Sequence, residues 1–244
     1  MIPIRDTIPS RNAPIVTWAL ICANVLVFVF QLALPESQLE RLFYLFGIVP
    51  LRFTHPDWAT WVGFPADNFW PFLTSIFLHG GWLHLILNMW TLWIFGDNVE
   101  DRMGPVRFLL FYLFCGLVAG VAHTLTNANS TIPVIGASGA IAGVLGAYFL
   151  LFPVSRILCV IPVFFYPLVV QIPAFLYILF WFGSQLFSGA LSLLEPGQVG
   201  GIAWWAHIGG FVAGVLTFRL FIVRQPPRRP WFRDERGIEG AWWR

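Results

Sequence analysis

The stretch GASGAIAGVLGAYFLLF, residues 136–152, begins with a serine between small residues and carries no charged side chain. A helix from Ser138 to Phe152 would be about 22 Å long, because each residue adds 1.5 Å. That length is short of the roughly 30 Å hydrocarbon core of a membrane. If its far end lies at the cytoplasmic surface, Ser138 lies below the opposite surface. We therefore expect residues 127–136 to enter the membrane as irregular backbone, which is tolerated there only around a cavity or inside protein.

The whole chain has a membrane protein's composition, with 58% hydrophobic and 11% charged residues, against about a quarter charged in soluble domains. Runs long enough to cross a bilayer, or nearly so, occur six times. They cover residues 15–34, 81–96, 106–126, 138–152, 168–190 and 203–223. The sequence thus predicts an all-α polytopic membrane domain of six transmembrane helices over 15–223. A lead (1–14) precedes it and an arginine-rich tail (224–244) follows it.

The basic residues indicate an orientation. All 14 are arginine, and only Arg41 and Arg52 fall outside the two termini and the connections 97–105 and 153–167 with their adjoining helix ends. Because cytoplasmic loops are enriched in basic residues, both termini are expected in the cytoplasm of a prokaryotic cell, with the domain in its inner membrane. The tail also contains Trp231, Trp242 and Trp243, so it is expected to lie against lipid headgroups rather than to bind nucleic acid.

One connection is unusually long. Residues 35–80 follow the first span and contain an amphipathic stretch, Glu36 to Phe46, and then several tryptophans and phenylalanines. A loop with this aromatic content is expected to be partly embedded in the outer leaflet.

Ser138 is the candidate nucleophile. A serine at a helix N-terminus beside Gly136 and Gly139 is accessible, and the free N–H groups of the first turn can stabilise a developing oxyanion. The alternative role for this motif is close helix packing, since Gly139, Gly143 and Gly146 form a small-residue face.

His207 is the candidate general base. It lies about four residues into the last segment, roughly 6 Å along that helix, at a depth comparable with that of Ser138. Gly210 and Gly214 share its helix face, so this helix can approach the glycine face of residues 138–152 closely. Contact would bring the imidazole to the hydroxyl, which is how a serine is activated. The alternative is a histidine that only hydrogen-bonds two helices together.

His84 and Asn88 are four residues apart and lie on one helix face. Both side chains donate hydrogen bonds without adding charge, so they are candidates for oxyanion support, with His79 as a supporting residue. Interhelical hydrogen bonding or a metal site are the alternatives. No nearby carboxylate completes a set of histidine ligands and the H-E-x-x-H signature is absent, so we expect neither a metal nor another cofactor.

Together these motifs resemble the rhomboid family of intramembrane serine proteases. The similar segments are GASG (136–139), HGGWLHLILNMWTLWIFG (79–96), AHIGGFVAG (206–214), FGIVPLRF (46–53) and VEDRMG (99–104). The resemblance implies a Ser138–His207 dyad, an oxyanion hole from His84, Asn88 and the Ser138 N–H, and single-pass membrane proteins as substrates. It also implies a lateral gate at the aromatic fifth segment, whose aromatic residues could equally be plain lipid-facing surface. Some family members carry an aromatic residue four positions after the nucleophile, whereas this chain has Ala142.

A second hypothesis is a non-catalytic membrane protein that binds or escorts transmembrane helices through the same groove. A channel or transporter is disfavoured, because its ionisable residues should line a path through the membrane. Here they are confined to the outer half of the predicted domain.

Overall fold

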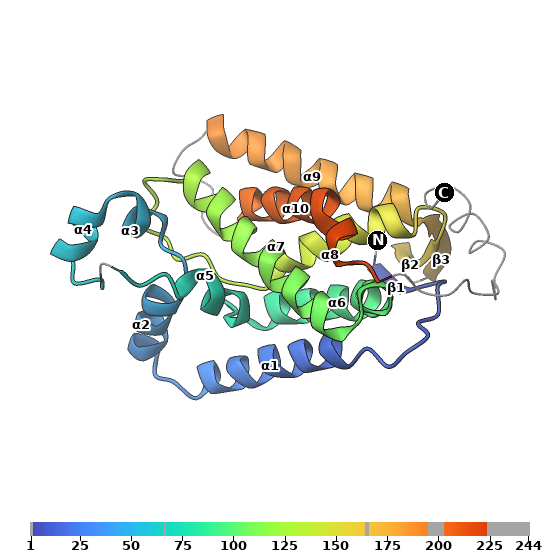
Figure 1. Ribbon diagram of the computed structural model, residues 1–244, viewed down its shortest axis with the longest axis horizontal. Helices are drawn as coiled ribbons and strands as arrows, with labels where there is room; N and C mark the ends of the chain where they lie inside the picture. The colour runs from blue at the N-terminus through green and yellow to red at the C-terminus, as the bar shows by residue number, and fades with distance from the viewer. Residues whose placement is uncertain (1, 66, 164–165, 195–202, 224–244) are drawn as a thin grey trace.

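The computed structural model describes residues 2–65, 67–163, 166–194 and 203–223. Its long helices are α1 (Ile15–Leu32), α6 (Trp82–Met103), α7 (Pro105–Thr126), α8 (Ser138–Leu151), α9 (Ala174–Leu194) and α10 (Trp204–Phe221). The loop after α1 contains α2 (Glu36–Phe46), α3 (Pro50–Thr54), α4 (Pro56–Trp61), α5 (Pro71–Thr74) and the 3-10 turn η1 (Ser75–Phe77). Three strands, β1 (Ile2–Asp6), β2 (Arg156–Val163) and β3 (Tyr166–Pro173), complete the fold. The long helices run roughly along the long axis of the molecule (Figure 1).

Each of the six predicted apolar segments overlaps one of the long helices, so the mostly helical, polytopic fold class is confirmed. By length and composition, α1, α7 and the 174–192 part of α9 can each cross a membrane. A fourth crossing results if α5–η1 and α6, which meet at 93°, count as one broken span. Helix α8 is apolar but has 14 residues, about 21 Å. The number of six crossings remains a prediction.

One predicted helix boundary is wrong. The second segment was expected to end at residue 96, with a connection over 97–105, but α6 continues to Met103 and the chain turns at Gly104, whose φ is 74°. The helix continues through the polar residues of this stretch because their side chains form hydrogen bonds with other residues. For example, Nδ2 of Asn98 donates to Oδ2 of Asp6. Glu100 accepts hydrogen bonds from the backbone N–H groups of Val16 and Thr17, in the first turn of α1, at 2.9 Å and 2.7 Å. It thereby caps that helix.

A second difference is a small sheet, which the sequence did not predict. Residues 156–173 form the antiparallel hairpin β2–β3, and β1 from the N-terminal lead pairs with β2. The fifth segment, expected to be helical from residue 168, therefore begins as a helix only at Ala174. Pro162, Pro167 and Pro173 explain this, since proline disrupts a helix interior. The intervening valines and isoleucines favour strands.

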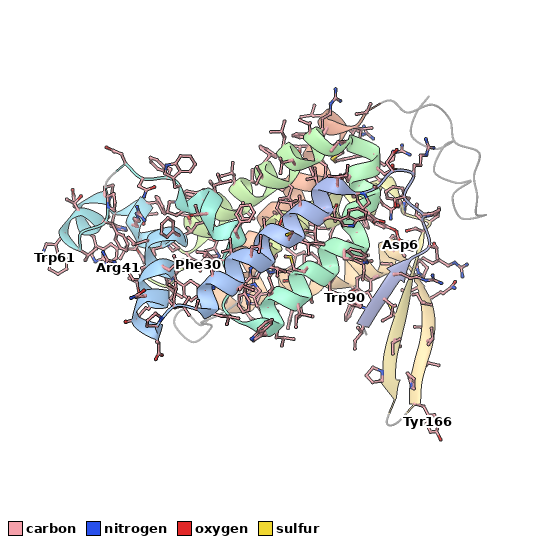
Figure 2. All side chains as sticks on the ribbon, turned by 90° about the horizontal axis from the view of Figure 1, so that it is seen from below. Asp6, Phe30, Arg41, Trp61, Trp90 and Tyr166 are labelled. Atoms are coloured by element: carbon pink, nitrogen blue, oxygen red, sulfur yellow. The ribbon has the colours of Figure 1, made fainter. Side chains whose placement is uncertain are left out.

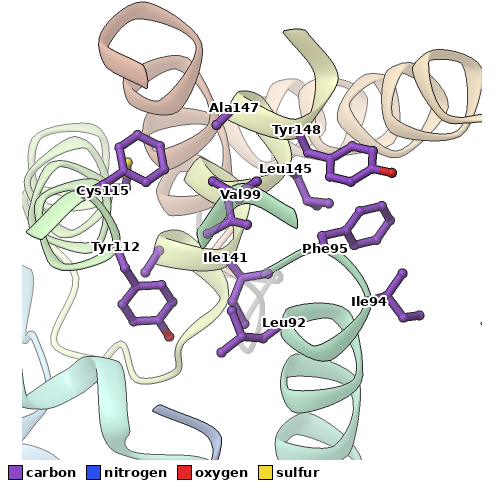
Figure 3. Packing of buried hydrophobic residues seen from close by; sticks show 14 of the residues in the cluster. Leu92, Ile94, Phe95, Val99, Tyr112, Cys115, Ile141, Leu145, Ala147 and Tyr148 are labelled. Carbon is purple, nitrogen blue, oxygen red and sulfur yellow. The ribbon is translucent and has the colours of Figure 1, made fainter. Parts of the chain in front are cut away.

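The core lies between α6, α7 and α8. Leu92 and Phe95 of α6 pack against Tyr112 and Cys115 of α7 and against Ile141 and Tyr148 of α8 (Figure 3). Most side chains of α8 are buried, which is the expected state of a helix that is apolar on all sides. Helix α8 is the central helix, and its N-terminus carries Ser138.

The long loop forms the end of the molecule opposite the sheet (Figure 1). The amphipathic stretch from Glu36 to Phe46 is helix α2. Trp61, Phe69 and Trp70 are exposed, as expected of a loop that contacts lipid; embedding in a leaflet remains a prediction. Arg52 is buried in the loop, with its guanidinium carbon 4.8 Å from the ring centre of Phe64. Burial lowers the pKa of Arg52.

Residues 127–137, which precede Ser138, form no helix. Their backbone is paired with the long loop. Val134 and Ile48 exchange two hydrogen bonds, at 2.7 Å and 3.0 Å, and the N–H of Gly136 donates to Ser75 at 2.8 Å. Irregular backbone inside a membrane protein needs such internal partners.

Candidate active site

The structure brings Ser138 and His207 together. Oγ of Ser138, the first residue of α8, lies 2.8 Å from Nε2 of His207 in the first turn of α10. Both side chains are half-buried. The two residues are 69 positions apart in the chain, so only the packing of α8 against α10 creates this contact.

Glycines make that packing possible. A methyl group on Gly210 would overlap the carbonyl oxygen of Gly139, and one on Gly214 would overlap that of Gly143. The backbones of α8 and α10 therefore lie against each other with no side chain between them, as in small-residue contacts of membrane helices. Gly139 follows Ser138 directly, and Gly210 lies one turn after His207. Each glycine contact thus sets the separation of the two reactive side chains.

His84 and Asn88 of α6 lie beside the chain that leads to Ser138. A Cβ on Gly136 would be 2.6 Å from Nε2 of His84 and 3.6 Å from Nδ2 of Asn88. Gly136 has a φ of 123°, which favours glycine, and any side chain there would displace the His84 ring. His79 is fully buried, its Nε2 is 3.0 Å from Nδ2 of Asn88, and its backbone is held by two hydrogen bonds with Gln31.

His79 accordingly orients Asn88. The amide nitrogen has two hydrogens; one donates to His79, and the other is left for a group near Gly136. The N–H groups of the first turn of α8 have no partner within the helix. Four neutral donors, from His84, Asn88 and the backbone at Ser138 and Gly139, thus surround the entry to α8.

One residue of the site was missed in the sequence. Gln185 of α9 is buried, and its Oε1 lies 2.7 Å from Nδ1 of His207. A polar residue in an apolar segment was a usable signal, the same one that marked His84. The sequence contained nothing, however, to indicate that Gln185 faces His207. Rings of Trp181 and Trp204 also lie near the imidazole, with centroids 6.1 Å and 6.3 Å away.

Among the described residues, no group of three or more histidine, cysteine, aspartate or glutamate side chains is arranged to hold a metal ion. The chemistry available at the site is that of a hydroxyl, an imidazole and neutral hydrogen-bond donors.

Comparison with known proteins shows the family of this chain. Residues 66–224, more than half of the chain, match the family profile of the Rhomboid domain. The chain belongs to the rhomboid family. RHOMBOID-like protein 6, mitochondrial, of Arabidopsis thaliana is 30% identical over 175 residues, which cover 72% of this rhomboid and 50% of that relative. The family and the apolar helices together show that this rhomboid is an integral membrane protein.

Two further relatives match shorter parts. Rhomboid protease GluP of Bacillus subtilis (strain 168) is 45% identical over 80 residues, which are 33% of this rhomboid and 15% of that relative. Rhomboid protein 1, mitochondrial, of Saccharomyces cerevisiae (strain ATCC 204508 / S288c) is 31% identical over 146 residues, 58% of this chain and 39% of the relative. This rhomboid spans half or less of the length of these relatives.

Proposed function

We propose that this rhomboid is an intramembrane serine endopeptidase. Its substrates would be single-pass membrane proteins, cut in or near their transmembrane segments. The observation that carries the proposal is the 2.8 Å distance between Ser138 Oγ and His207 Nε2. A serine hydroxyl is a weak nucleophile, and a hydrogen bond to a base is what activates it.

In the proposed reaction, Ser138 Oγ attacks the carbonyl carbon of the scissile peptide bond while its proton passes to His207 Nε2. The carbon–nitrogen bond then breaks, and His207 returns the proton to the leaving amine. An acyl ester on Ser138 remains. Water attacks this ester, gives a proton to His207 and releases the second product, and the proton then returns to Ser138.

The negative charge that develops on the carbonyl oxygen would be stabilised by His84, Asn88 and the backbone N–H groups at the start of α8. Such preorganised donors commonly provide about 3–4 kcal/mol each of transition-state stabilisation. The His79 contact supports this role for Asn88, because a donor acts best when its direction is fixed before the reaction.

Substrate would enter from the side, past α9. Phe180 and Phe187 of this helix are exposed, whereas Phe182 stacks on Phe211 of α10 at 4.2 Å between ring centres. Helix α9 thus has one aromatic face for lipid or substrate and one for the protein. A transmembrane segment that unwinds near small residues would reach Ser138 most readily, since an intact helix hides its peptide bonds.

Cleavage of a reconstituted single-pass substrate by the wild type and by Ser138→Ala tests the proposal. We expect the variant to lose at least about a thousandfold in rate, because it has no nucleophile. Ser192→Ala is the matched control, since the Ser192 hydroxyl donates to the carbonyl of Gly189 within α9. Equal cleavage by the wild type and Ser138→Ala would refute the proposal.

A wild type that retains the substrate through purification but never cuts it would instead support the escort hypothesis. Labelling by a fluorophosphonate adds a substrate-independent readout. It should modify the wild type and be lost in Ser138→Ala and in His207→Ala.

A further inference from the structure

The proposed reaction uses Nε2 of His207 and leaves its other ring nitrogen unexplained. Nδ1 lies 2.7 Å from Oε1 of Gln185, whose side chain is 6% exposed. The residue comes from α9, so the imidazole lies between α8 on one side and α9 on the other. Three helices therefore meet at a single ring.

The direction of the Gln185 amide follows from its other contacts. Its Nε2 is 3.0 Å from Oγ of Ser184 and 3.3 Å from the carbonyl oxygen of Trp181. A carbonyl oxygen only accepts, so the NH₂ group must lie on that side. The Ser184 hydroxyl donates to the same Trp181 carbonyl at 2.6 Å, which leaves its lone pair for Gln185. The carbonyl oxygen of the Gln185 amide consequently faces His207.

This direction assigns the tautomer of His207. Because an amide oxygen cannot donate, Nδ1 must carry the hydrogen of the bond to Gln185. A neutral imidazole has one N–H, so Nε2 is left with a lone pair that points at the Ser138 hydroxyl. That is the form in which a histidine can accept a proton from a serine.

Among the described residues, few other side chains hold the imidazole of His207, so its contact with Gln185 matters more. Position 142 is alanine, so no side chain of α8 stacks on the imidazole from there. Trp181 lies beside the ring at an interplanar angle of 35°, and it is also the residue whose carbonyl anchors Gln185. One turn of α9, residues 181–185, thus provides both a ring contact and a hydrogen-bond acceptor for His207.

We propose that Gln185 is a positioning residue, which holds His207 in the Nδ1–H tautomer with Nε2 directed at Ser138. This inference rests on the proposed proteolytic function. When His207 gains the serine proton, both ring nitrogens carry hydrogen, and the bond from Nδ1 to the amide oxygen becomes charge-assisted and stronger. An amide provides this acceptor without placing a carboxylate in an apolar helix, where an unpaired charge is costly.

The decisive variant is Gln185→Met, which keeps the length and bulk of the side chain but has no strong acceptor. In proteoliposomes with a single-pass substrate, we expect kcat to fall about 10- to 100-fold, the range typical of partners that orient metal-binding histidines. We expect KM to stay within about twofold, because Gln185 reaches substrate only through His207. Gln185→Glu retains an acceptor oxygen in either protonation state, so it should keep most of the wild-type kcat. Gln171→Met, at an exposed glutamine of β3, is the matched control.

Nitrogen-15 NMR of the His207 ring in the full-length protein provides a readout that needs no activity. The wild type should show a protonated Nδ1 and an unprotonated Nε2, and Gln185→Met should show a mixture of the two tautomers.

The results separate this inference from the proposed function. Suppose that Ser138→Ala abolishes substrate cleavage but Gln185→Met leaves both kcat and the His207 tautomer unchanged. The role of Gln185 is then overturned, and the proposed function stands. An equal loss of kcat in Gln185→Met and Gln185→Glu also overturns the role of Gln185, because lost packing would then be the cause. If the wild type cleaves nothing, the proposed function fails, and the NMR spectra still decide whether Gln185 sets the tautomer.

Discussion

Among single residues, glycines decide the separation of Ser138 and His207, because a glycine has only a hydrogen atom where other residues have a side chain. Gly139 and Gly210 touch through backbone atoms, and each lies one to three residues from a reactive side chain. Any side chain at Gly210 must push α10 away from α8. The geometry of the reactive pair therefore depends on these glycines as well as on the pair itself.

We predict that Gly210→Ala destabilises the protein by about 1–3 kcal/mol, the usual cost of overpacking. It should also slow fluorophosphonate labelling of Ser138, because Nε2 of His207 moves out of hydrogen-bond range. Thermal unfolding in detergent and the labelling rate measure the two effects. Gly183→Ala on α9 is the control, since nothing lies within 4 Å of its added methyl group. Equal behaviour of the two variants would contradict the prediction.

At the scale of elements, Asp6 joins the sheet to the helices. Its Oδ2 accepts hydrogen bonds from Nδ2 of Asn98 in α6 at 2.7 Å and from the hydroxyl of Tyr148 in α8 at 2.6 Å. Figure 2 shows Asp6 where β1 meets the helices, while Tyr166 lies at the far end of the hairpin. Nε1 of Trp90 in α6 donates to the carbonyl of Pro3 at 2.6 Å and holds the other end of β1. Burial, reinforced by the nearby charge of Asp97, raises the pKa of Asp6 to about 8.

This pKa predicts a stability that depends on pH. An unfolded aspartate has a pKa near 3.8, so between about pH 4 and pH 8 the folded state holds one proton more than the unfolded state. The contribution of Asp6 is therefore greatest below pH 4 and is lost as pH rises through 8, at no more than about 1.4 kcal/mol per pH unit.

Unfolding temperatures at pH 5, 6.5 and 8 test this. We expect a fall with pH in the wild type and a smaller fall in Asp6→Asn, whose amide does not titrate. Asp57→Asn, at an exposed position in α4, should behave like the wild type. An equal pH dependence in Asp6→Asn and the wild type would exclude Asp6 as its source.

At the scale of the whole molecule, the two ends of the described chain lie together. Asp6 is bonded to α6 near its C-terminal end, and beyond α10 the N–H of Val223 donates to the carbonyl of Arg102 at 3.1 Å. The sheet and these ends occupy one end of the bundle, and the long loop occupies the other (Figure 1). An even number of membrane crossings is the simplest path that produces this arrangement.

We therefore predict that both termini face the same compartment, and from the arginine distribution that this is the cytoplasm. Reporters fused to each terminus, active only on one side of the membrane, measure this in cells. A reporter inserted after Trp61, an exposed residue of the long loop, should give the opposite result. Termini on different sides would exclude six crossings.

Much of this fold was predictable because its signals are local. Apolar runs marked the positions of all six long helices, and the amphipathic stretch from Glu36 corresponds to α2. Errors arose where distant partners decide the structure. Asp97 and Asn98 look like turn residues, yet they are helical because the N-terminal strand and α6 satisfy their polar groups. Strand β2 was missed because its pairing with residues 2–6 is not visible in either segment alone.

The amino-acid chain alone was enough to identify a polytopic membrane protein of the rhomboid family, with Ser138, His207, His84 and Asn88 as candidate site residues. Composition and short motifs carry that information, and few polar residues are tolerated in apolar helices. The contact of Gln185 with the second ring nitrogen of His207 became evident only in the folded protein. The sequence does not show how a helix that is apolar on all sides is rotated about its own axis, and therefore which face it turns toward its neighbour. Packing against α10, through Phe182 on Phe211, sets that rotation for α9.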